Sequence, residues 1–243
     1  MPGPVKTEAV VLRSLRYGEA DRILHLYTPR RGKVGAIAKG VRRARSRFGG
    51  RLEPFFRLNL ILHEGRSELL TVTSAETVAG YPRLREDADA LDTVARACDA
   101  VSRLFDTTEP HPDVYNLLCN ELALLDARAG GDGFSGHANQ LAFRLKLLLA
   151  AGLAPQLAAC ASCGEREHLT GFSGAAGGVV CSACEAGSFP LDEEAHVFLV
   201  GAMGRALAET PPGSPRALRQ AERAIADTVE HHAGVRLRQA AAR

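Results

Sequence analysis

The sequence predicts an α+β multidomain protein that consists of an N-terminal β-barrel, an α-helical domain and a four-cysteine module. Three observations predict this organisation. Short apolar runs fill the first eighty residues, helical periodicity begins after Tyr81, and two Cys-x-x-Cys pairs interrupt the helical part. We place the barrel at residues 1–80, the helical domain at 81–155 and 189–243, and the cysteine module, inserted in the helical domain, at 156–188.

The strands of the barrel are read from alternation. The run PFFRLNLILH places Phe56, Leu58, Leu60 and Leu62 on one face, which is the period of a half-buried strand. ELLTVT follows after a short turn and predicts a hairpin. Earlier runs of the same kind are TEAVVLRS, DRILHLYT and GKVGAIAKG. About five strands in eighty residues suit a small closed barrel better than a sandwich.

The helices are read from apolar stripes. The first stripe runs from Leu91 to Phe105, a second helix begins near Asp113, and a third carries leucines from Leu141 to Leu149 and stops at Gly152. Two more helices are predicted at 192–209 and 214–238, separated by TPPGSP, with Ser214 as the N-cap of the last.

The two cysteine pairs form the most specific local signal. CASC and CSAC give the spacing C-x2-C-x17-C-x2-C, which predicts one structural Zn²⁺ held by Cys160, Cys163, Cys181 and Cys184. Two disulfides would need an oxidising compartment, and a redox pair would not need a second copy. His168 lies between the pairs and is interpreted as a loop residue rather than a ligand. Four protein ligands leave no open coordination position, so the zinc is expected to support folding rather than catalysis.

Charge divides the chain unevenly. Residues 1–80 contain 15 Lys and Arg against 7 Asp and Glu, and the remainder contains 15 against 21. A solvated basic surface is one interpretation, and contact with a polyanion is the other. No run approaches the roughly 18 apolar residues of a membrane helix, and MPGPVKTEAVV has no apolar signal segment. We therefore expect a soluble cytoplasmic protein without membrane contact.

The basic charge is concentrated between Arg22 and Leu52, where ten cations occur without an acidic residue. Strand-like runs flank this stretch, which predicts loops and strand edges of the barrel rather than a disordered tail. Such a face is typical of proteins that bind single-stranded nucleic acid. Aromatic residues are few, so phosphate contacts are expected to dominate, and neutralised phosphates favour annealing. The aromatic residues near the stretch are Tyr17, Tyr27, Phe48, Phe55 and Phe56, of which Phe56 is assigned to the core.

Residues 10–55 read VVLRSLRYGEADRILHLYTPRRGKVGAIAKGVRRARSRFGGRLEPF. With its G-E-x-D-R start, R-x-G-K turn and A-K-G-x-R-x-x-x-S-R core, this run resembles the N-terminal domain of the RecO family of recombination mediators. LLAAGLAPQLAACASCG resembles the entry of that family into its cysteine segment, so the similarity spans nearly the whole chain.

The resemblance implies an N-terminal OB-fold, a helical domain and a zinc module. It also implies DNA repair and homologous recombination, with binding of single- and double-stranded DNA and annealing of complementary strands, including strands coated by single-stranded-DNA-binding protein (SSB). The implied partners are RecR, the SSB C-terminal tail and, indirectly, RecA. The family has no catalytic residue to transfer, so no enzyme activity is expected, and the cytoplasmic protein would associate with the nucleoid.

Carried over to matching positions, the resemblance assigns the DNA-binding face to Arg30, Lys33, Lys39, Arg42, Arg43, Arg45, Arg47 and Arg51. The SSB tail would meet a cation beside apolar residues of the helical domain, for which Arg144 and Lys146 are the candidates. Two other classes of protein stay open. One is an RNA-binding or ribosome-associated zinc protein, and the other is a zinc-dependent nuclease or hydrolase, which the closed ligand set disfavours. The absence of G-x-x-x-x-G-K-[ST] agrees with a function that needs no nucleotide.

Overall fold

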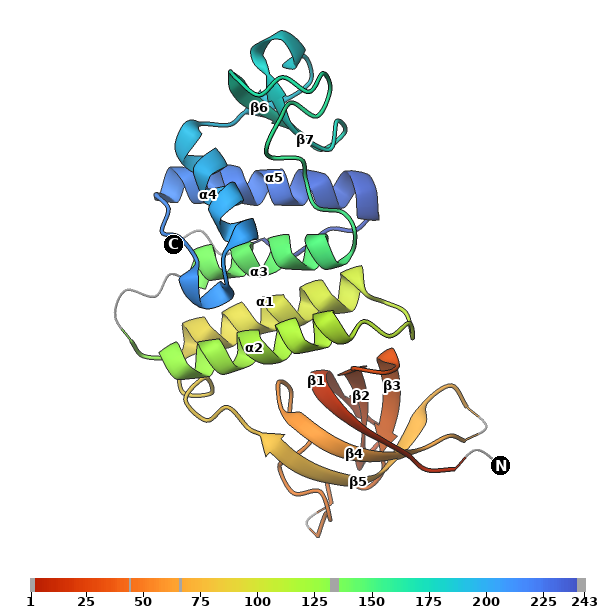
Figure 1. Ribbon diagram of the computed structural model, residues 1–243. Helices are drawn as coiled ribbons and strands as arrows, with labels where there is room; N and C mark the ends of the chain where they lie inside the picture. Colours follow the sequence, from red (N-terminus) through yellow and green to blue (C-terminus); the bar gives the residue numbers. More distant parts are fainter. Residues whose placement is uncertain (1–2, 44, 66, 132–135, 240–243) are drawn as a thin grey trace. The chain divides into compact units, whose positions relative to one another are not determined.

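The computed structural model describes residues 3–43, 45–65, 67–131 and 136–239. The chain forms two compact units, Met1–Gly131 and Asp132–Arg243 (Figure 1). The elements of the first unit are β1 (Val5–Tyr17), β2 (Asp21–Thr28), β3 (Gly32–Ala38), β4 (Arg57–His63), β5 (Leu70–Ala79), α1 (Ala88–Leu104) and α2 (Pro112–Arg128). Those of the second are α3 (Gly136–Ala150), β6 (Leu169–Ser173), β7 (Gly178–Cys181), the short 3₁₀ helix η1 (Ser182–Cys184), β8 (Phe189–Pro190), α4 (Glu193–Gly204), η2 (Leu207–Glu209) and α5 (Pro215–Ala233).

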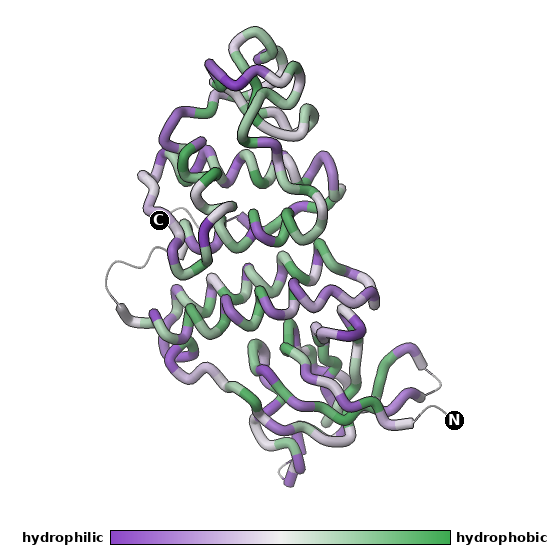
Figure 2. The backbone as a smooth tube through the Cα atoms, viewed as in Figure 1, coloured by the Kyte–Doolittle hydropathy of each residue, from purple (hydrophilic) through white to green (hydrophobic). Residues whose placement is uncertain are grey.

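The five strands of the first unit close into a barrel with the order β1-β2-β3-β5-β4 and with β1 paired to β4. All neighbours are antiparallel except β3 and β5. The strands of the barrel carry apolar segments (Figure 2), and in β4 buried residues alternate with more exposed ones. The predicted alternation in β4 is confirmed, because Leu58, Leu60 and Leu62 are buried in the barrel core and Phe56 packs against it. The predicted OB-like barrel is therefore confirmed.

Helices α1 and α2 pack on the barrel through polar contacts as well as apolar ones. The Glu8 carboxylate on β1 accepts hydrogen bonds from Arg57 on β4 (2.7 Å) and from the Tyr115 hydroxyl on α2 (3.0 Å). The guanidinium of Arg57 holds the pKa of Glu8 below its usual range. Lys33 on β3 pairs with Asp106, just after α1, at 2.5 Å. These contacts tie one side of the barrel to the two helices.

Gly32 begins β3 where the chain passes close to the segment between α1 and α2. Its φ is +48°, and a Cβ atom there would lie 2.3 Å from the Glu109 carbonyl oxygen. We expect Gly32→Ala to lower the free energy of unfolding by about 1 to 3 kcal/mol, measured by urea denaturation. Gly18→Ala is the matched control, because Gly18 has a φ of +53° but no atom within 4 Å of the added Cβ. Equal losses in both variants would show that the close approach to Glu109 has no cost.

The second unit contains α3, α4 and α5 together with a three-stranded sheet of order β7-β6-β8. Two predicted helix ends are wrong. The helix predicted to reach Glu209 ends at Gly204, because Arg205 is extended and only a short 3₁₀ turn follows. The helix predicted to reach Arg238 ends at Ala233, because Gly234 adopts a left-handed conformation with φ of +65°. Among the described residues, no helix combines the length and the apolar character needed to cross a membrane.

Candidate nucleic-acid interface and metal centre

The basic stretch forms the folded loop between β3 and β4, residues 39–56. Phe48 and Leu52 anchor it, because their side chains are 2% and 1% exposed within the barrel core. The first part is also tethered to the β1–β2 turn, where the Gly40 N–H donates to the Asp21 carboxylate and the Arg42 N–H donates to the Ala20 carbonyl. The loop lies at the end of the barrel away from α1 and α2 (Figure 1).

We define the basic loop cluster as the six cations Lys39, Arg42, Arg43, Arg45, Arg47 and Arg51. All six are exposed, although the loop that carries them is anchored in the core. Within the described residues, no carboxylate forms an ion pair with any of them. Their hydrogen bonds and ring contacts within the described residues are to neutral groups. For example, Arg42 donates to the Glu19 carbonyl, and the guanidinium of Arg47 lies 4.8 Å from the centre of the Phe48 ring.

Three other cations of the same stretch form ion pairs with carboxylates of the protein. Arg22 pairs with Glu53 at 3.0 Å and Arg31 pairs with Glu64 at 2.6 Å. Lys33, one of the predicted DNA contacts, pairs with Asp106, so its charge is partly compensated before any ligand binds. Arg30, the other predicted contact outside the basic loop cluster, is exposed. The uncompensated charge thus lies in the loop and at Arg30.

The four cysteines lie together although the two pairs are far apart in sequence. The Sγ atoms of Cys160, Cys163, Cys181 and Cys184 all lie within 4.8 Å of one another, and those of Cys163 and Cys181 are 3.7 Å apart. A tetrahedral ion with bonds of about 2.3 Å to sulfur places neighbouring sulfur atoms ~3.8 Å apart. The four thiols therefore fit one four-coordinate metal ion.

Backbone hydrogen bonds shape the two cysteine turns. The Gly164 N–H donates to the Cys160 carbonyl, and the Ser182 N–H donates to the His168 carbonyl. His168 itself is an exposed residue. The backbone N–H of Cys181 lowers the pKa of the Cys160 thiol to about 6, whereas hydrogen bonds from neighbouring thiols raise the pKa of Cys184 to about 12. Four thiols this close cannot all ionise without a cation to offset their repulsion.

The cysteine module is docked on α5. The Gly174 N–H in the β6–β7 turn donates to the Asp227 carboxylate at 2.6 Å, and the Gly174 carbonyl lies 2.8 Å from Nε2 of His232. The guanidinium of Arg223 lies 4.1 Å from the centre of the Phe189 ring on β8. The folding of the module and the position of α5 are therefore linked.

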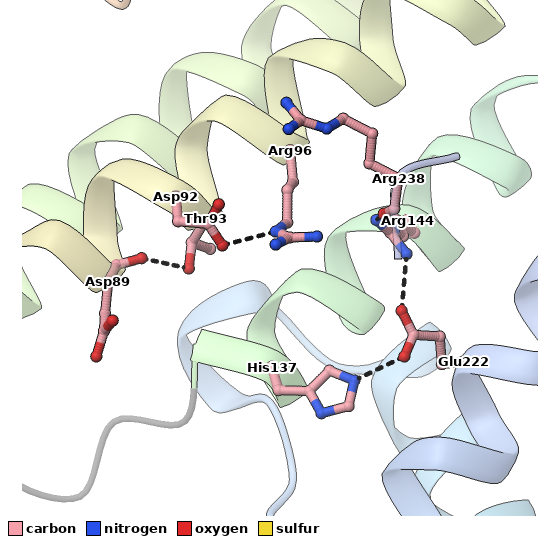
Figure 3. A network of polar contacts seen from close by, with 8 residues as sticks. All are labelled: Asp89, Asp92, Thr93, Arg96, His137, Arg144, Glu222 and Arg238. Carbon is pink, nitrogen blue, oxygen red and sulfur yellow. Dashed lines mark hydrogen bonds and ion pairs between the residues drawn. The ribbon is translucent and has the colours of Figure 1, made fainter. Parts of the chain in front are cut away.

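The two candidate partner-binding cations lie in different surroundings on α3. Arg144 is buried, and its guanidinium forms an ion pair with the Glu222 carboxylate at 3.5 Å. The guanidinium also donates a hydrogen bond to the Arg238 carbonyl. The His137 side chain lies next to the same Glu222 carboxylate (Figure 3). Lys146 is only partly buried and donates to the Met203 carbonyl at the end of α4 at 3.2 Å.

Exposed apolar side chains on α3 and α4 were not found by reasoning from the sequence. Leu149 is 54% exposed on α3, and Val197 and Val200 are 62% and 48% exposed on α4. A signal was present, because α4 has apolar residues on all sides although it is not fully buried. Lys146 lies one turn before Leu149 on α3 and contacts the Met203 carbonyl in the last turn of α4, so a cation lies beside the exposed Leu149.

Comparison with known proteins agrees with this architecture. The family model for the recombination protein O N-terminal domain matches residues 1–81, and that for its C-terminal domain matches residues 85–241. DNA repair protein RecO of Anaeromyxobacter sp. (strain K) is 39% identical over 241 residues, 96% of this chain and 93% of the relative. DNA repair protein RecO of Rubrobacter xylanophilus is 38% identical over 231 residues, 93% and 90% of the two chains. The chain therefore belongs to the RecO family of DNA repair proteins.

Proposed function

We propose that this protein binds single- and double-stranded DNA through the basic loop cluster and anneals complementary strands, without catalysing a reaction. The observation that carries the proposal is the set of six exposed cations, which have no carboxylate partners in the part of the chain that the structure describes and are presented by a loop anchored in the barrel core. Cations of this kind bind the phosphate backbone irrespective of sequence. Membership of a DNA repair family favours DNA over RNA as the polyanion.

The arrangement suits annealing because the cations meet phosphates and leave the base edges free. Two complementary strands repel each other through their phosphates, and neutralising these charges lowers the repulsion. The bases can then pair with little competition from the protein. The four-cysteine site would hold Zn²⁺, and the closed set of four thiolates supports a structural role for the ion.

The proposal extends to the partners of a recombination mediator. The protein would anneal SSB-coated strands and act with RecR to promote the loading of RecA, as a cytoplasmic protein associated with the nucleoid. Lys146 is the better candidate for contact with the acidic and hydrophobic SSB tail, because it is only partly buried and lies one turn from the exposed Leu149 on α3. Arg144 is buried against Glu222 and would support this surface from within.

The test is an annealing assay with two complementary labelled oligonucleotides and no ATP. We expect the wild-type protein to accelerate annealing. The variant with Lys39, Arg43, Arg45 and Arg47 all changed to Ala is expected to lose at least about ten-fold in rate, since contacts to several phosphates are removed. These four side chains are exposed and repel one another, so the variant should unfold at a temperature no lower than that of the wild type.

A matched control removes the same charge elsewhere. Arg166, Arg205, Arg216 and Arg219 are exposed residues of the second unit, and their joint replacement by Ala should leave annealing intact. Equal loss in both variants would place the DNA path outside the loop. The absence of annealing in the wild type, together with tighter binding of RNA than of DNA of equal length, would favour the RNA-binding alternative.

A further inference from the structure

The aromatic residues near the basic loop cluster differ sharply in exposure. Tyr27 and Phe48 are buried in or beside the barrel, and Phe56 packs against its core. Phe55 is partly buried. Tyr17, at the end of β1, is 54% exposed, and every other tyrosine and phenylalanine among the described residues is buried or partly buried. An exposed aromatic ring beside a DNA-binding loop is where a nucleobase can stack.

The strand register places Tyr17 on the side of the barrel that faces the loop. Tyr17 pairs directly with Asp21 across β1 and β2, and directly paired residues share one face of a sheet. The Asp21 carboxylate accepts a hydrogen bond of 2.8 Å from the Gly40 N–H, so this face borders the start of the loop. Arg22 pairs with Ala38, and Lys39 of the basic loop cluster is the next residue along the chain.

The surface next to Tyr17 is also suited to a base. Leu15 pairs with Ile23, and Ile23 pairs with Ile37, so three partly buried aliphatic residues form a row across β1, β2 and β3 beside Tyr17. Arg13, two residues before Leu15 on the same strand, is exposed. The aliphatic row thus lies between Tyr17 and Arg13, which flank Leu15 on β1.

We propose that Tyr17 stacks on one base of a single strand whose phosphates contact the basic loop cluster. This inference rests on the proposed DNA binding and names a contact to the base rather than to the phosphate. The face of a base is uncharged, so the contact with the Tyr17 ring does not depend on charge, whereas the nearby Glu19 and Asp21 carboxylates repel the phosphates of the strand. Every base has such a face, so the contact carries little sequence preference.

The test compares binding to oligo(dT) with binding to an abasic oligonucleotide of equal length, which has the same phosphates but no bases. We expect Tyr17→Ala to weaken binding to oligo(dT) by about five-fold or more and to leave binding to the abasic strand unchanged. Tyr17→Phe keeps the ring and is expected to bind both strands as the wild type does. The four-alanine variant of the loop is expected to weaken binding to both strands alike.

A second measurement needs no variant. Photo-cross-linking of the wild-type protein to oligo(dT) that contains 5-iodouracil should label the tryptic peptide that contains Tyr17. A cross-link elsewhere, or an equal loss on the abasic strand in Tyr17→Ala, would overturn the stacking contact while leaving the proposed DNA binding intact. Failure of the wild type to bind either strand would overturn both proposals.

Discussion

Replacement of Cys160 and Cys163 by serine is expected to abolish zinc binding and to unfold the cysteine module, residues 156–188. A structural four-thiolate site contributes on the order of 10 kcal/mol or more of metal-binding free energy to local folding. Without the ion, the buried cluster around the site loses its centre, because it consists mainly of Cys160, Val180 and Cys181. The other buried residues of the sheet, Phe172, Val179 and Phe189, lie outside this cluster. The variant should therefore contain no zinc and give less soluble protein.

The expected loss extends to α5, because the β6–β7 turn binds Asp227 and His232 through Gly174. Zinc content, thermal unfolding and hydrogen exchange of residues 156–188 and 215–233 would be measured together. Cys98→Ala and Cys119→Ala are the controls, since both thiols are buried outside the cluster and should leave one zinc ion per chain. Wild-type stability and exchange in a metal-free variant would contradict a structural role for the ion.

The second large effect is the dependence of DNA affinity on salt. If about five phosphates are contacted, the slope of log affinity against log salt is about −3.5 for a single strand, so a four-fold rise in salt weakens binding by about a hundred-fold. The variant with Lys39, Arg43, Arg45 and Arg47 changed to Ala should show a slope of about −0.7, which corresponds to one remaining contact.

The slope reports the number of phosphates contacted in the complex, whereas the fraction of folded protein is measured separately by thermal unfolding at each salt concentration. The control with Arg166, Arg205, Arg216 and Arg219 changed to Ala should keep the wild-type slope. A slope near zero for the wild-type protein would contradict DNA binding through phosphate contacts.

Local patterns in the sequence predicted much of the fold. The period-two run in β4 predicted the burial of Leu58, Leu60 and Leu62, and the Cys-x-x-Cys spacing predicted the meeting of four thiols. Both follow from short-range geometry, the alternation of a strand and the tight turn that joins two cysteines. Gly234 is also a local signal for the end of α5, because glycine adopts the left-handed conformation that ends a helix.

Contacts between distant residues were not predictable in this way. Lys33 and Asp106 are 73 residues apart, and nothing near either residue indicates that they form an ion pair. The burial of Arg144 against Glu222 likewise depends on how α3 packs on α5. A cation in a sequence shows its charge but not its counterion, and the availability of that charge for a ligand is therefore a property of the tertiary structure.

The anchored basic loop has a thermodynamic consequence for the free protein. Six like charges are held close together by Phe48 and Leu52 with no carboxylate partners among the described residues, so they repel one another whenever no polyanion is bound. Added salt screens this repulsion and so stabilises the folded barrel, whereas the same salt lowers the affinity for DNA. The charged loop thus lowers the stability of the unbound protein. When DNA binds, its phosphates offset the repulsion between the six cations.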